Sequence, residues 1–90
     1  MTDIQGDPVS PRAWREEQEL SLSQLAVLIG LRGKNVRTTY HKYERGENSA
    51  PLEVIAKIDT MSAGRVTYLS WLAVRRAWLA AHPKREKIAA

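Results

Sequence analysis

Positively charged side chains are concentrated in one short stretch near the middle of the chain. Between residues 32 and 45, five cations stand beside one histidine and a single acid: Arg32, Lys34, Arg37, Lys42 and Arg45, with His41 and Glu44. Such a local cluster is the electrostatic signature of a phosphate-binding surface, although a merely solvated basic face has the same composition. The whole chain carries a net charge of +4 at pH 7. The sequence therefore points first to electrostatic recognition of a nucleic acid.

No arrangement of residues in the sequence indicates catalysis or metal binding. There is no nucleophile beside an evident base, no pair of acids, and no Gly-Lys-Ser/Thr that would turn Gly30 and Gly33 into a phosphate loop. The chain has no cysteine, and its two histidines, His41 and His82, have no carboxylate cluster around them. We expect a protein that is not an enzyme, with no metal, no cofactor and no evident small-molecule ligand.

Helical signals divide the sequence into five segments, and no stretch predicts a strand with any strength. Ser10-Pro11, Ser21 and Thr67 are typical helix starts, whereas Gly30 and Gly46 are typical helix ends. Asn35 is a further candidate for a cap. Apolar residues repeat at three- and four-residue steps between these signals. The expected helices cover residues 11–19, 22–29, 36–45, 51–61 and 68–81.

The domain organisation follows from the same pattern. Residues 1–9 are polar and aperiodic and are expected to form a flexible arm. Residues 10–82 form one helical domain, and residues 83–90 form a charged tail. No apolar run approaches the roughly 20 residues of a membrane span, and no signal peptide is evident. We expect a cytoplasmic protein without a membrane partner, associated with the nucleoid when bound to DNA.

Several motifs in a fixed order resemble the lambda-repressor-like (Cro/C-repressor, XRE-type) helix-turn-helix family of phages and bacteria. They are residues 15–21 (REEQELS), Leu25-Ala26, Gly30-Leu31 and residues 40–46 (YHKYERG), within a region of about residues 12–60. The resemblance implies an all-α, five-helix domain that reads the major groove with its third helix. This chain departs from the family by an extended turn between the second and third helices, residues 32–35, and it ends in a long C-terminal helix.

The resemblance also assigns roles to individual residues. It implies a buried Tyr40 and an ion pair between Arg15 and Glu44, which otherwise would be solvated surface charges. Arg37 is the candidate for a bidentate contact to guanine, and Thr38 for a thymine methyl group. For each of these residues taken alone, the alternative to a base contact is a contact to a DNA phosphate, or a side chain that is simply exposed to solvent. The expected DNA-binding residues are Arg32, Lys34, Asn35, Arg37, Thr38, Thr39, His41, Lys42 and Arg45.

The C-terminal helix carries two apolar stripes. Trp71, Val74 and Trp78 form one stripe, and Leu69, Leu72 and Leu79 form the other. Two stripes suit a helix that packs on its own domain and on a symmetric partner, whereas a bundle that wraps the helix on both sides would bury both. The expected dimer interface comprises Trp71, Val74, Trp78 and Leu79.

Together these features predict a sequence-specific regulator of transcription that binds double-stranded DNA. The leading hypothesis is a repressor that binds an inverted-repeat operator as a homodimer. The alternative is an interaction module, such as an antitoxin or adaptor domain, that acts mainly through protein contacts of its C-terminal helix.

Overall fold

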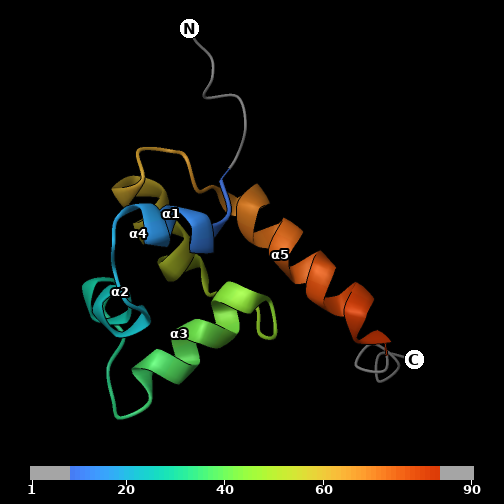
Figure 1. Ribbon diagram of the computed structural model, residues 1–90, viewed down its shortest axis with the longest axis horizontal. Coiled ribbons are helices and arrows are strands. Elements are labelled where there is room, and N and C mark those ends of the chain that lie inside the picture. The colour runs from blue at the N-terminus through green and yellow to red at the C-terminus, as the bar shows by residue number, and fades with distance from the viewer. Residues whose placement is uncertain (1–8, 84–90) are drawn as a thin grey trace, which may run out of the picture.

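The computed structural model describes residues 9–83, and within this range it contains five helices and no strand (Figure 1). The predicted all-α, five-helix fold is thus confirmed. The helices, in chain order, are α1 (Pro11–Glu17), α2 (Leu22–Leu28), α3 (Val36–Arg45), α4 (Leu52–Met61) and α5 (Tyr68–Ala81).

The predicted start signals act through their side chains. The hydroxyl of Ser10 accepts a hydrogen bond from the backbone N–H of Ala13, 3.0 Å away, at the first turn of α1. Ser21 and Gln24 form a reciprocal capping box at the start of α2, with bonds of 3.0 and 2.8 Å. Both caps satisfy backbone donors that a helix start leaves unpaired. Asn35 stands at the N-cap position of α3 but makes no such side-chain bond, so the expected cap is not formed there.

The first two helices end earlier than predicted. α1 stops at Glu17 because Glu19 adopts a left-handed conformation with φ of 58°. The turn is held by Arg15, whose guanidinium donates to the Leu20 carbonyl at 2.9 Å. α2 ends at Leu28, and Gly30, with φ of 91°, turns the chain toward α3. A periodic pattern does not reveal such ends, because they are set by the backbone conformations of Glu19 and Gly30.

The core lies where the first four helices meet the start of α5. Leu25, Ala26 and Tyr40 are fully buried, Tyr40 as predicted, and Tyr40 meets Trp71 edge to face with ring centroids 6.4 Å apart. Edge-to-face contacts of this kind are favourable for aromatic rings. Leu28, at the end of α2, is 53% exposed and lies outside this core.

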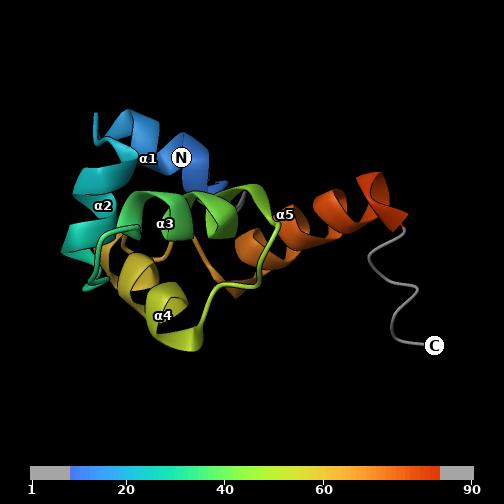
Figure 2. The same ribbon diagram turned by 90° about the horizontal axis from the view of Figure 1, so that it is seen from below.

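The last helix, α5, leaves the body of the molecule and projects beyond it (Figures 1 and 2). Its middle is fastened to the end of α3, since Arg75 donates to the carbonyls of Gly46 and Glu47, both at 2.7 Å. Gly46 has φ of 88°, and a Cβ atom there would lie 2.5 Å from the Val74 carbonyl oxygen. Only glycine allows the two backbones to approach this closely.

The expected arm and tail fall on residues 1–8 and 84–90, which lie outside the described residues. Val9 was assigned to the arm, but its N–H donates to the Arg65 carbonyl at 3.0 Å, so it belongs to the packed domain. None of the helices described in residues 9–83 has the length and apolar character needed to cross a membrane.

Candidate nucleic-acid interface

The helix α3 lies on the surface of the domain with one long side uncovered. In the view from below, α3 crosses the middle of the molecule, with α1 and α2 on one side and α4 on the other (Figure 2). α2 packs directly against it. Other helices of the domain thus support α3 on its inner side, and its outer side is open to a partner.

The sequence of α3 divides its residues between the two sides. Tyr40 and Glu44, one turn apart, are its buried residues. On the opposite side stand polar and basic residues, which is the composition of a helix that enters the major groove. Of the residues predicted there, Arg37, Thr38 and Arg45 are exposed, whereas Thr39, His41 and Lys42 are half-buried.

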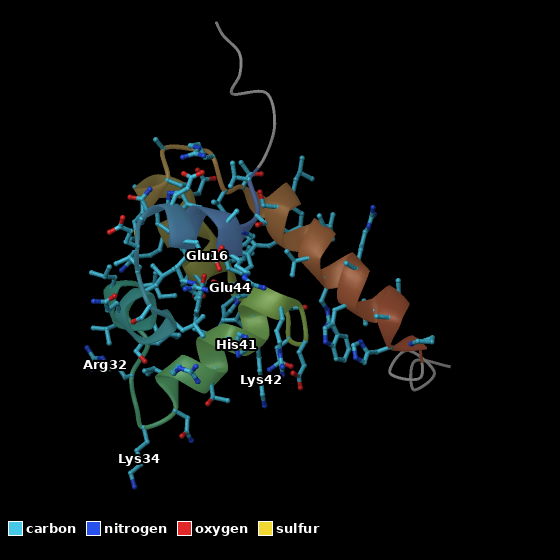
Figure 3. All side chains as sticks on the ribbon, viewed as in Figure 1. Glu16, Arg32, Lys34, His41, Lys42 and Glu44 are labelled. Atoms are coloured by element: carbon cyan, nitrogen blue, oxygen red, sulfur yellow. The ribbon has the colours of Figure 1, made fainter. Side chains whose placement is uncertain are left out.

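The extended turn between α2 and α3 adds charge at the start of α3. Arg32, Lys34 and Asn35 are all exposed. Arg32 and Lys34 extend away from the body of the molecule (Figure 3). Gly33 has φ of 109°, a left-handed conformation that the turn requires and that favours glycine. The turn therefore presents two cations beside the start of α3.

Arg15 of α1 and Glu44 of α3 form a buried, bidentate ion pair between these two helices. Arg15 Nε and Nη2 donate to the two carboxylate oxygens of Glu44 at 2.8 and 2.9 Å, and the two side chains are only 12% and 2% exposed. The hydrogen bonds to Glu44 raise the pKa of Arg15 above its ordinary value. Burial raises the pKa of Tyr40 well above its usual range, and the charge of Glu44 adds to that effect. The pair fixes α1 against the C-terminal half of α3.

A groove runs between α1, the start of α2 and α3, and we call it the α1–α3 groove. Its rim brings Arg37 and Arg45 of α3 together with Arg12 of α1, which the sequence analysis did not single out. Arg12 also pairs with Glu16 at 3.1 Å on the exposed side of α1. The available signal was its spacing, since Arg12 precedes Arg15 by three residues and shares its helix face. The groove is lined by Arg12, Arg15, Leu22, Arg37, His41, Glu44 and Arg45.

The residues predicted for the dimer interface divide between two sides of α5. Trp71 is only 5% exposed and packs on Tyr40, so it belongs to the core of its own domain. Val74 and Trp78 approach the backbone of Gly46. Leu79 is half-buried, as Val74 and Trp78 are, and the exposed member of its stripe is Leu69, at 63%.

Comparison with known protein families gives a match over the region of α3. A family model described as helix-turn-helix matches residues 12–60, which is more than half of the chain. The matched range contains α3 and the turn before it, and it leaves out α5. No curated protein and no solved structure is significantly similar to the chain.

Proposed function

The chain belongs to the helix-turn-helix family of lambda-repressor- and Cro-like, XRE-type proteins, which are DNA-binding regulators of transcription, and we propose that it is a repressor that binds an inverted-repeat operator as a homodimer. In this proposal α3 lies in the major groove and α5 joins two copies. The observation that carries the proposal is the uncovered side of α3, which is polar and basic and is flanked by further cations on the preceding turn.

Base reading and phosphate binding are assigned to different residues of this surface. Arg37 and Thr38 lie near the start of α3, where a recognition helix meets base edges, and both are exposed. Arg37 has the donor geometry to bind guanine, and Thr38 has a methyl group to meet thymine. Phosphate contacts, which position the protein without reading sequence, suit the remaining polar residues of the interface. These are Arg32, Lys34, Asn35, Thr39, His41, Lys42 and Arg45.

The reading role is tested by replacing Arg37 with alanine after sites have been selected from random duplex DNA. Affinity for the selected site should fall by about 1–3 kcal/mol, and affinity for unrelated duplexes should fall far less. Arg65→Ala is the matched control, because Arg65 is also an exposed arginine but lies on the segment before α5, away from α3. Equal weakening on all sequences would make Arg37 a phosphate contact, and absence of binding to any duplex at low salt would refute the DNA-binding proposal.

Repression itself needs a cellular measurement. A reporter promoter overlapped by the selected site should lose output when the protein is expressed, and Arg37→Ala should restore that output. An increase in output on the wild-type protein would make it an activator instead.

Dimerisation is proposed through the outward side of α5. Leu69, Ala73 and Ala80 recur at helical spacing on this side and are exposed, with Leu79 half-buried beside them. Because α5 projects from the body, much of its length can be approached by a second α5 (Figures 1 and 2). A twofold contact of this type is self-complementary, as dimer interfaces usually are.

Leu69→Asp tests the dimer, with Leu52→Asp on α4 as the matched control. The two leucines are comparably exposed, at 63% and 75%, so neither change should unfold the domain. Sedimentation equilibrium should find a wild-type dimer and a Leu69→Asp monomer, and the monomer should lose the preference for a palindrome over a single half-site. A wild-type monomer at tens of micromolar that binds one half-site as tightly as the palindrome would refute the proposal.

The second candidate function, an interaction module, uses the same surface in a different way. The exposed Tyr68 and Leu69 lie on the helix outside the matched family region, and they would suit a different protein as well as a second copy. Tight association with a co-encoded protein, lost in Leu69→Asp while the wild-type chain alone stays monomeric, would favour this candidate over the repressor.

A further inference from the structure

We infer that the α1–α3 groove is a binding site for a DNA phosphodiester and that Arg12 is the ligand that α1 contributes to it. This inference rests on the proposed DNA-binding function and extends it to a helix outside the helix-turn-helix pair. It assigns a role in DNA recognition to a residue that the motifs do not mark.

The charge of the groove fits a phosphate. Four arginines and one glutamate are among the side chains that line it. The glutamate, Glu44, is already neutralised by the buried pair with Arg15 at 2.8 Å. The three remaining cations, Arg12, Arg37 and Arg45, come from two helices and stand on the exposed rim. Because Arg37 is assigned to base reading, Arg12 and Arg45 are the two that are available to a phosphate. Guanidinium groups are the donors that match the geometry of a phosphate.

The position of the groove fits the path of a DNA strand. The major groove is about 12 Å wide, and a helix with its side chains is about 10–12 Å across. A helix lying in the major groove therefore has phosphates along both of its flanks. The α1–α3 groove, with its arginines, lies on the flank of α3 that faces α1.

The acids beside the rim do not prevent this role. Arg12 pairs with Glu16 at 3.1 Å, and Arg45 pairs with Glu47. The Arg12–Glu16 pair is largely open to water, with side chains 72% and 55% exposed. Exposed pairs contribute between nothing and about 1 kcal/mol. A phosphate can therefore displace Glu16 from Arg12 at little cost, and Glu16 acts as a weak competitor for the site.

Two pairs of substitutions test the inference, with the exposed pair Arg65–Glu17 as a built-in control. Arg65 and Glu17 are joined at 2.7 and 2.9 Å and are also exposed. The segment before α5, to which Arg65 belongs, lies away from α3 (Figure 1). Arg12→Gln should weaken binding to all duplexes alike and lower the slope of log K against log salt by about 1. Arg65→Gln should leave the slope unchanged.

The acid substitutions should act in the opposite direction. Glu16→Gln removes the competitor and should strengthen binding to every duplex, whereas Glu17→Gln, one residue further along α1, should not. Circular dichroism melts of all four variants verify that the fold is kept, which the exposure of these side chains favours.

The outcomes of these experiments distinguish a failure of this inference from a failure of the proposed DNA-binding function on which it rests. A wild-type protein that binds no duplex refutes DNA binding as a whole. A wild-type protein that binds with a normal salt slope, while Arg12→Gln behaves as Arg65→Gln does, overturns only the phosphodiester site. A loss confined to one base position in Arg12→Gln also overturns it, because Arg12 would then read sequence.

Discussion

Replacing Arg15 with alanine should destabilise the domain far more than its place on a short surface helix suggests. The guanidinium makes three hydrogen bonds, two to the Glu44 carboxylate at 2.8 and 2.9 Å and one to the Leu20 carbonyl at 2.9 Å. The Glu44 side chain is 2% exposed, so alanine at position 15 leaves a buried carboxylate without its cation. Breaking a buried pair from one side costs about 3–5 kcal/mol. Typical domains have only about 5–15 kcal/mol of stability in total.

A double-mutant cycle separates the pair from its surroundings. Glu44→Ala should cost less than Arg15→Ala, because the 12% exposed guanidinium keeps its bond to Leu20 and can turn toward water. The double variant has no unpaired charge, so its loss of stability should fall short of the sum of the single losses by about 2–3 kcal/mol. Urea unfolding followed by the fluorescence of the buried Trp14 and Trp71 gives each free energy.

The exposed pair Arg12–Glu16 on the same helix provides the comparison. Its side chains are 72% and 55% exposed, and its coupling energy should be only about 0.3–0.5 kcal/mol. Equal coupling energies for the two pairs would refute the reasoning, since burial would then make no difference. If Arg15→Ala does not fold, Arg15→Lys keeps the charge without the two-pronged geometry and should still lose measurable stability.

Two further predictions concern the backbone and the surface charges. Gly46→Ala should lower the free energy of unfolding by at least about 2 kcal/mol more than Gly64→Ala does, because both glycines have positive φ but only at Gly46 would the new Cβ meet the Val74 carbonyl oxygen, at 2.5 Å. Equal losses in urea titrations would mean that only the positive φ matters. The hydrogen bonds from Arg65 lower the pKa of the Glu17 carboxyl, so the pair stabilises the fold above the ordinary glutamate pKa and loses this effect as the pH falls through the lowered pKa. An NMR titration of the Arg65→Gln variant should find the Glu17 pKa back at its ordinary value.

The helix that carries the candidate site lies where the sequence predicted it. The predicted range 36–45 coincides with α3, and the range 68–81 coincides with α5. Both ends are set by local chemistry, because Gly46 takes a left-handed conformation and Pro83 follows the end of α5 closely. The end of α1 was missed, because it depends on the left-handed conformation of Glu19, and apolar periodicity does not reveal the backbone conformation of a single residue.

The surface was harder to predict than the helices. Periodicity found two apolar stripes on α5 but could not say which one faces inward. Trp71 faces the core because Tyr40 is placed there by α3. Arg12 was overlooked for the same reason, since its significance depends on α1 lying beside Arg37 and Arg45. Such relations arise only when separate helices are brought together, and a single sequence does not encode them locally.

The attachment of α5 to α3 bears on how two copies would read DNA. Arg75 binds the carbonyls of Gly46 and Glu47 at 2.7 Å, directly after the last residue of α3. Gly46 also lies against the backbone of α5 at Val74. The helix proposed for dimerisation is therefore joined to the end of the helix proposed for reading, with no long linker between them. Half-sites of a dimer lie about 34 Å apart along the duplex, and a short, rigid connection of this kind would admit little variation in that spacing.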